Sequence, residues 1–250
     1  MVFISTHSST LIKTTPIQNI IMLEKETDES IEVVCPCYPA KAIGSIDFIE
    51  NTICDFIFFV EDNKAHLLLK EIIKKYIKLH QEHATALYRI IPVGGYLQTA
   101  ILAKNTRRQL HSQSKVYAIL DEDAFTIPDT QNPEFVRLRS KNRDLIYSLR
   151  CTPELWIIDK FEKRNLAVQK AIRAKFGCEY QNLINAPKYQ ACNSPSPRRL
   201  AKYKTNVLID LLKEYSGETE DNIFARLASI LIEQHLPNEE IDNFMRQFFN

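Results

Sequence analysis

The sequence lacks any apolar run near the roughly 18–20 residues that a membrane-spanning helix requires. It also has almost no net charge, at +1, so any phosphate contact would have to come from a local basic surface. The nucleotide-binding motif G-x-x-x-x-G-K-[ST] is absent too. We therefore expect no membrane partner, and neither ATP binding nor ATPase activity from this chain by itself.

Cysteines at zinc-binding spacing are missing as well. Six cysteines occur, but only Cys35 and Cys37 are close together, and neither a C-x-x-C motif nor a nearby histidine completes a site. Scattered cysteines without a signal peptide are typical of a reducing compartment. The expected location is therefore the cytoplasm.

What the sequence does contain is an alternation of apolar strands and amphipathic helices. Residues 56–60 are an apolar run bounded by charge, which indicates a strand buried on both faces of a parallel sheet. Further strands are predicted at 88–93, 115–120 and 154–158, with helices over 62–81, over 96–113 and after the last strand up to residue 176. The predicted fold class is α/β, with a mostly parallel sheet flanked by helices.

The parts of the chain before and after this alternation show other patterns. A hairpin is expected from residues 17–23 and 31–35, followed by a connector over 36–50. Residues 181–197 are polar and contain proline, which indicates a loop. Three helices, over 198–215, 219–234 and 237–249, are predicted to form a helical tail.

Acidic residues follow two of the predicted strands. Glu61 comes directly after the strand 56–60, and Asp121 and Asp123 follow the strand 115–120. Open α/β sheets build their sites at the carboxyl ends of the strands, and carboxylates that gather there repel one another unless a cation joins them. We therefore predict a divalent metal site, with acidic residues that merely lead into solvent as the alternative.

Three short motifs resemble the signatures of a Toprim domain, the metal-binding fold of bacterial primases, topoisomerases and certain nucleases. They are Phe58-Phe59-Val60-Glu61, Ile91-Pro92-Val93-Gly94-Gly95 and Ile119-Leu120-Asp121-Glu122-Asp123. The opening residues 2–12 resemble the histidine-switch strand that closes an ABC-type ATPase domain. In this order the motifs resemble the OLD family (overcoming lysogenization defect), whose members are ATP-dependent endonucleases, many of them in phage defence.

The resemblance implies a domain organisation and a set of ligands. It implies the end of an ATPase domain over residues 1–50, a Toprim domain over 51–178, and a helical region over 179–250 that completes the nuclease domain. It further implies Glu61 as an acid/base or metal-associated residue. Asp121 and Asp123 would be the ligands of Mg²⁺ or Mn²⁺.

The sequence departs from the family at one acidic position. Family members often carry a second acid four positions after the glutamate, where this chain has Ala65, and Asp62 cannot replace it from the same face of the helix. A further acid commonly follows the Asp-x-Asp strand. Asp159, at the end of the predicted strand 154–158 and with Glu154 behind it, is the candidate ligand, and a helix N-cap is the alternative for it.

A basic stretch begins the helical tail. Family members place a lysine near the metal ions, which implies Lys204 or Lys202 as a catalytic residue that neutralises charge developing on the phosphate. Arg198 and Arg199 would bind the DNA backbone. The alternative is a solvated basic helix start.

His7 stands where an ABC ATPase has the histidine that contacts the γ-phosphate. Because the Walker A motif is absent, His7 is expected to bind nucleotide only if an upstream segment or a separate ATPase chain supplies the rest of that site. ATP is accordingly expected only through such a missing or partner ATPase domain. The chain would then be a fragment, a truncated product or one subunit of a larger assembly.

The sequence thus predicts a metal-dependent DNA endonuclease of the OLD-like Toprim type. Its expected partners are DNA, an ATPase chain or upstream ATPase domain, and further copies of itself in a homo-oligomer. The alternative of another class is a degenerate, non-catalytic Toprim module that acts in assembly, regulation or DNA binding. Primase-like or topoisomerase-like chemistry ranks lower, because no zinc-binding region and no tyrosine-bearing strand-passage domain is visible.

Overall fold

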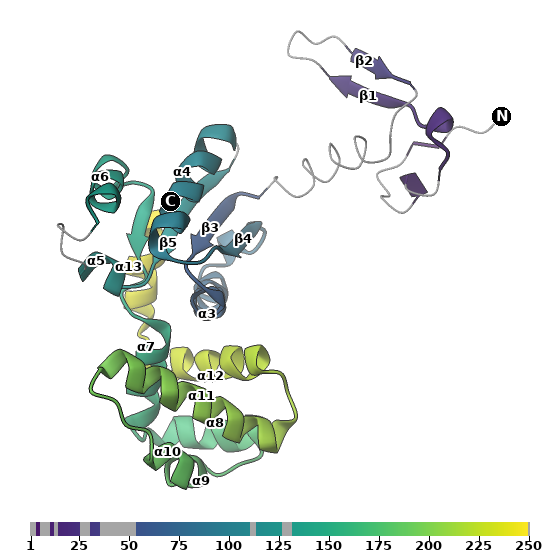
Figure 1. Cartoon of the computed structure of the whole chain (residues 1–250). Helices are drawn as coiled ribbons and strands as arrows, with labels where there is room; N and C mark the ends of the chain where they lie inside the picture. The colour runs from purple at the N-terminus through teal and green to yellow at the C-terminus, as the bar shows by residue number, and fades with distance from the viewer. Residues whose placement is uncertain are drawn as a thin grey trace. The chain divides into compact units, whose positions relative to one another are not determined.

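The computed structural model describes residues 4–5, 11–12, 15–25, 31–35, 54–110, 114–126 and 132–249. Its contacts divide the chain into two compact units, Met1–Cys54 and Asp55–Asn250 (Figure 1). The division falls close to the boundary expected near residue 50. Within the second unit the contacts do not separate residues 51–178 from 179–250.

The first unit contains the expected hairpin. Strand β1 (Met22–Lys25) pairs antiparallel with β2 (Ile31–Val34), with Met22 opposite Val34, and the short helix η1 (Ile17–Asn19) precedes it. Of the opening residues 2–12, Ile4, Ser5, Leu11 and Ile12 are described, and none of these four is in a strand. His7, Cys37 and the connector over 36–50 lie outside the described residues.

The second unit is built on a parallel sheet, as the sequence predicted. Within its described residues the strand order is β4 (Tyr88–Pro92), β3 (Phe56–Val60), β5 (Lys115–Leu120) and β6 (Ile146–Ser148), and every neighbouring pair is parallel. The first strand of this sheet, β3, therefore lies in the middle, with the second strand on one side of it and the third on the other. This arrangement creates a topological switch point between β3 and β5.

The sheet is covered by helices on both faces. Phe56, Phe58 and Val60 of β3 belong to the core shared with α3 (Asn63–Leu79) and α13 (Asn238–Phe249), whose Phe248 ring lies 5.6 Å from that of Phe58. Helix α4 (Tyr96–Leu110) packs against β3 and β5 on the opposite face (Figure 1). All five residues of β3 are buried, because alternate side chains of a strand point to opposite faces and both faces are covered.

The predicted fourth strand over residues 154–158 is wrong. These residues belong to helix α7 (Pro153–Glu162), and the fourth strand of the sheet is the short β6 that precedes it. Proline is favoured in the first turn of a helix, and Ile157, Ile158 and Phe161 recur at helical spacing on the buried face of α7. The apolar run Leu155–Ile158 is compatible with a strand or with a buried helix. Its packing against neighbouring helices favours the helix.

The remaining helices complete the second unit. Helices α5 (Asp123–Thr126), α6 (Pro133–Lys141) and η2 (Gln81–His83) are short, and α8 (Leu166–Phe176) ends at Gly177 as predicted. The predicted loop over 181–197 instead contains the short helices α9 (Tyr180–Ile184) and α10 (Pro187–Gln190). Helices α11 (Pro197–Ser216), α12 (Glu220–His235) and α13 match the predicted tail. Among the described helices, none combines the length and the apolar character needed to cross a bilayer.

Candidate metal centre

Three of the predicted site residues come together at the switch point of the sheet. Val60 is level with Ile119 across β3 and β5, so Glu61 and Asp121 emerge side by side at the carboxyl ends of the two strands. Asp123 starts α5 two residues later. Each of the three carboxylates offers an oxygen, and these oxygens all lie within 4.8 Å of one another. Among the described residues they are the only such group of three acidic, histidine or cysteine ligands.

Asp121 is the most buried member of this group. It is 3% exposed, and its Oδ1 has no hydrogen-bond partner among the described residues. Burial raises the pKa of Asp121 from 3.8 to about 8, and the negative charges of its neighbours, Glu61 first, add to that shift. A buried carboxylate oxygen without a partner is costly, so the fold holds Asp121 in a place where a cation would stabilise it.

Glu61 is held by backbone groups of both neighbouring strands. Its Oε1 accepts a hydrogen bond from the backbone N–H of Asp121 at 2.9 Å, and its backbone carbonyl accepts one from Gly94 at 2.8 Å. Burial raises the pKa of Glu61, while the hydrogen bond from Asp121 opposes the shift.

The Gly-Gly turn explains why glycine is needed between the two acidic motifs. Gly94 and Gly95 have φ angles of 108° and 79°, which side chains of L-residues rarely allow. This backbone turns the chain from β4 into α4 and places the N–H of Gly94 against the carbonyl of Glu61. The turn therefore fixes the backbone from which the Glu61 side chain projects.

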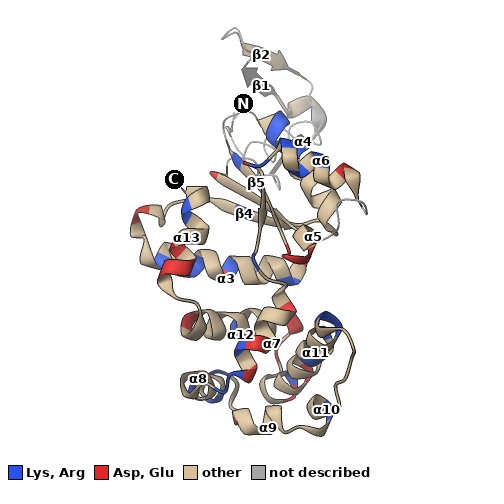
Figure 2. Cartoon of the chain, turned by 90° about the vertical axis from the view of Figure 1, so that its left-hand side faces the viewer, with Lys and Arg blue, Asp and Glu red and all other residues tan. Residues whose placement is uncertain are grey.

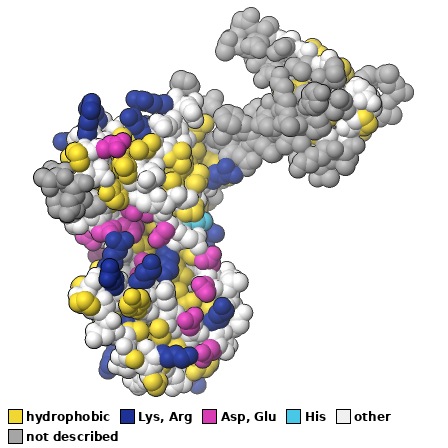
Figure 3. All heavy atoms as spheres, viewed as in Figure 1, with side chains coloured by type: hydrophobic (Ala, Val, Ile, Leu, Met, Phe, Trp, Pro, Cys, Tyr) yellow, Lys and Arg dark blue, Asp and Glu magenta, His cyan; other side chains and the backbone are white. Residues whose placement is uncertain are grey.

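Asp123 is more accessible than Asp121 and already has a cationic partner. Its Oδ2 forms an ion pair with the guanidinium of Arg198, at the start of α11. The Arg198 side chain is 59% exposed. Figure 3 shows basic and acidic side chains close together in the second unit, and Figure 2 marks the backbone positions of acidic residues near α5. The structure thus brings one of the two predicted DNA-binding arginines to the carboxylates.

Four other predicted residues lie elsewhere. Asp159 is exposed on α7 rather than at a strand end, and its Oδ2 pairs with Lys160 at 2.9 Å and with Lys163 at 3.3 Å, so the structure does not place it in the ligand group. Lys204 pairs with Glu162 at 2.6 Å. Lys202 and Arg199 are exposed on α11.

Two further residues matter for this group: Glu154, which the sequence pattern placed only behind Asp159 and in a strand, and Lys64, which no sequence pattern singled out. Glu154, in the first turn of α7, is 8% exposed, and its charge is among those that raise the pKa of Asp121. Lys64, in the first turn of α3, pairs with Glu154 at 3.3 Å. The signal in the sequence was Pro153 directly before Glu154. A proline at this position is typical of a helix start and would have indicated a helix rather than a strand.

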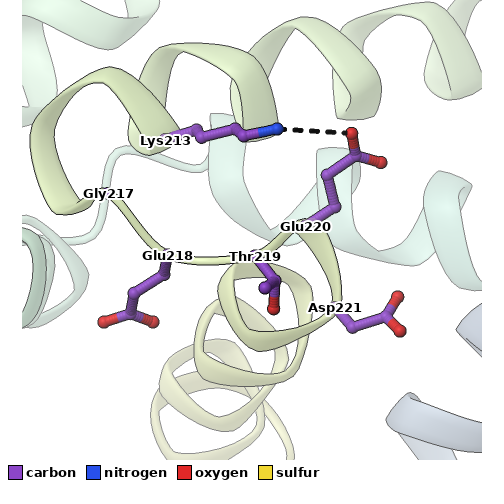
Figure 4. A pocket seen from close by; sticks show the side chains of 6 residues that line it. All are labelled: Lys213, Gly217, Glu218, Thr219, Glu220 and Asp221. Carbon is purple, nitrogen blue, oxygen red and sulfur yellow. Dashed lines mark ion pairs between the residues drawn. The ribbon is translucent and has the colours of Figure 1, made fainter.

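Two hollows in the described surface lie apart from the three carboxylates, none of which lines either of them. One of about 490 Å³ lies at the junction of α11 and α12, where Lys213 and Glu220 form an ion pair at 3.8 Å (Figure 4). The other, of about 330 Å³, lies between α3, α11 and α12 and is lined by Lys64, Asn206 and Asp210 among others. Only the second reaches the surroundings of the carboxylates, through Lys64.

Comparisons of the chain with protein-family models, with curated proteins and with solved structures find no match. The conclusion about this site therefore rests on its geometry. Glu61, Asp121 and Asp123 can hold a metal ion, and oxygen-only ligands are the set that hard divalent cations prefer.

Proposed function

We propose that this protein is a metal-dependent DNA endonuclease of the OLD-like Toprim type, acting in anti-phage defence. The observation that carries the proposal is the meeting of three carboxylates at the switch point, one of them with a buried oxygen that has no protein partner among the described residues. The order of the acidic and Gly-Gly motifs along the chain adds the family resemblance.

The residues present fit Mg²⁺ or Mn²⁺. Both ions take carboxylate oxygens, and they keep open positions for water and phosphate oxygens. Glu61 and Asp121 come from adjacent strands of a rigid sheet, so their geometry is fixed before any ion binds. Thiolate and imidazole ligands, which zinc prefers, do not belong to this group of side chains.

Chemically, a bound ion would supply an activated water and stabilise charge on the leaving oxygen of a phosphodiester. Glu61, Asp121 and Asp123 would hold the ion, and Glu61, fixed by the Asp121 N–H, would also orient the attacking water and accept its proton. Because Arg198 pairs with Asp123, it would lie beside the bound ion. It would bind a DNA phosphate there once its ion pair with Asp123 breaks. An ATPase domain or chain, if one accompanies this unit, would be the partner that controls access to DNA.

The test is plasmid nicking by the purified protein with Mn²⁺. We expect nicking by the wild type and its loss in Asp121→Asn, because the substitution keeps the shape of the side chain and removes its charge. Asp159→Asn is the matched control, since it makes the same chemical change at an exposed carboxylate outside the ligand group. Equal nicking by all three proteins would exclude these carboxylates as the catalytic centre.

A second candidate function is a non-catalytic module that binds DNA or assembles with an ATPase. It is favoured by the ion pair of Arg198 with Asp123, which already neutralises one ligand, and by Ala65 in place of a second acid. Calorimetry separates the two candidates: the endonuclease binds Mn²⁺ and the non-catalytic module does not.

A further inference from the structure

The carboxylates at this edge of the sheet differ in how the protein neutralises them. Asp123 pairs with Arg198, and Glu154 pairs with Lys64. Within the described structure the Glu61 carboxylate accepts a hydrogen bond from a backbone N–H and none from a side chain, and Asp121 has an oxygen with no partner. Of these four carboxyl groups, the two without a side-chain partner in the described structure are therefore Glu61 and Asp121.

Lys64 is held between three helices. Its Nζ lies 3.3 Å from Glu154 Oε1 of α7 and donates a hydrogen bond to Asn206 Oδ1 of α11 at 3.1 Å. The side chain is only 24% exposed, and that of Glu154 only 11%. Dissolved salt screens such a partly buried ion pair much less than an ion pair on the open surface.

The position of Lys64 has no explanation in helix stability. It lies in the first turn of α3, where the positive end of the helix dipole disfavours a cation. The capping role at this helix end belongs to Asp62, whose Oδ1 accepts the N–H of Ala65 at 2.9 Å. A lysine that opposes the dipole and yet reaches a buried glutamate indicates a role at that glutamate.

Helix α3 also offers no carboxylate that could join Glu154 in holding a second ion. Ala65, one turn after Glu61, is fully buried, and Asp62 is turned into the cap of its own helix. The only buried acid left near Asp121 outside the ligand group is Glu154, among the described residues. Lys64 already forms an ion pair with that glutamate.

We propose that this centre holds a single divalent cation on Glu61, Asp121 and Asp123, and that the ammonium group of Lys64 takes the place of a second cation at Glu154. The inference rests on the proposed metal centre and adds to it a positioning residue and a stoichiometry. Lys64 holds Glu154 in place by their ion pair, and it keeps a second ion out.

The experiment counts Mn²⁺ bound to the full chain by equilibrium dialysis and reads the distance between ions from the electron paramagnetic resonance spectrum. We expect one ion per wild-type chain with an uncoupled manganese spectrum. Lys64→Met should release Glu154 and raise the count to two, with a spin-coupled spectrum, since paired ions in two-metal sites lie about 3.5–4 Å apart. Lys64→Arg keeps the charge and should bind one ion.

The double variant Lys64→Met/Glu154→Gln is the matched control and should return to one ion, because the released carboxylate is gone. One ion in a folded Lys64→Met protein, or a coupled spectrum from the wild type, overturns the inference while the proposed function stands. The wild-type spectrum decides the question even if Lys64→Met does not fold. A folded wild type that binds no Mn²⁺ overturns the proposed function itself, and the inference with it.

Discussion

The burial of the Asp121 carboxyl group lowers the stability of the metal-free protein. An ordinary aspartate loses its proton near pH 4, whereas burial keeps the proton on Asp121 up to about pH 8. Between these values the unfolded chain gains from ionisation and the folded protein does not, so folding stability falls as pH rises. Such a cost is the usual sign of a residue placed for a ligand rather than for the fold.

We therefore predict that Asp121→Asn stabilises the metal-free protein. With a chelator present at pH 7.5, its melting temperature should exceed that of the wild type by several degrees, since about 1 kcal/mol corresponds to about 2–4 °C for a chain of this size. The difference should shrink as pH falls towards 4 and vanish below it, where the wild-type carboxyl becomes protonated in the unfolded state too. Thermal unfolding across this pH range, with Asp159→Asn for comparison, checks the prediction. A lower melting temperature for Asp121→Asn at pH 7.5 would contradict it.

Arg198 pairs with Asp123. Under the proposed function it would compete with the metal ion for Asp123 in the free protein and would bind a phosphate when DNA is present. Substitutions at this residue should therefore move the two affinities in opposite directions.

For Arg198→Gln we predict a several-fold tighter Mn²⁺ affinity and a weaker DNA affinity. Removing the guanidinium lowers the repulsion felt by the ion and removes one phosphate contact, so the salt slope of DNA binding should fall by about 1. Calorimetry with Mn²⁺ and DNA-binding titrations at several salt concentrations measure both effects. Arg199→Gln is the control: it is exposed on the same helix and should leave the Mn²⁺ affinity unchanged. Weaker Mn²⁺ binding by Arg198→Gln would count against the proposed competition.

At the scale of elements, helix α3 and helix α13 are joined by one ion pair. His80, the C-cap of α3, lies 2.7 Å from Asp242 of α13. Its hydrogen bond with Asp242, assisted by Glu82, raises the pKa of His80 above the usual value for histidine. A raised histidine pKa contributes stability that is fully present below pH 6.5 and is lost as pH rises through the folded value.

We predict that His80→Gln lowers the melting temperature at pH 5.5 and has a much smaller effect at pH 8.5. The pair Tyr76–His80, with ring centroids 4.5 Å apart, is lost at both values, so the difference between them isolates the charge. Thermal unfolding at the two pH values gives the measurement. An equal loss at both would show that His80 acts through packing alone.

Some features of the candidate site could be predicted from the sequence, and others depend on how the elements pack. Glu61 and Asp121 were predicted to meet because the carboxyl ends of parallel strands share one edge of a sheet, a relation that depends only on strand order. Glu154 was misplaced because Leu155–Ile158 is apolar throughout, and a short apolar run does not distinguish a strand from a buried helix. Lys64 was invisible because its partners come from α7 and α11, which only tertiary packing brings to α3.

At the scale of the whole molecule, the contacts place a boundary between Cys54 and Asp55. The sheet, the helices on both its faces and all the proposed ligands belong to Asp55–Asn250. This unit has its own core, so it meets the physical requirement for folding by itself.

We predict that a protein consisting of residues 55–250 folds cooperatively and binds Mn²⁺ with the affinity of the full chain. Circular dichroism, thermal unfolding and calorimetry on the two proteins check this. A molten or aggregated 55–250 protein would show that residues 1–54 are needed to complete the fold. Intact folding with lost Mn²⁺ binding would instead show that those residues contribute to the metal centre.

The packing of α13 on β3 has a consequence for synthesis. The Phe249 ring lies 4.3 Å from that of Phe56, so within residues 55–249 the segment that leaves the ribosome last covers the strand that left it first. Until α13 emerges, one face of the central strand stays open to chaperones, and the long-range contacts of the sheet cannot all form. A nascent chain of this protein should therefore carry no finished group of the three carboxylates before α13 has emerged.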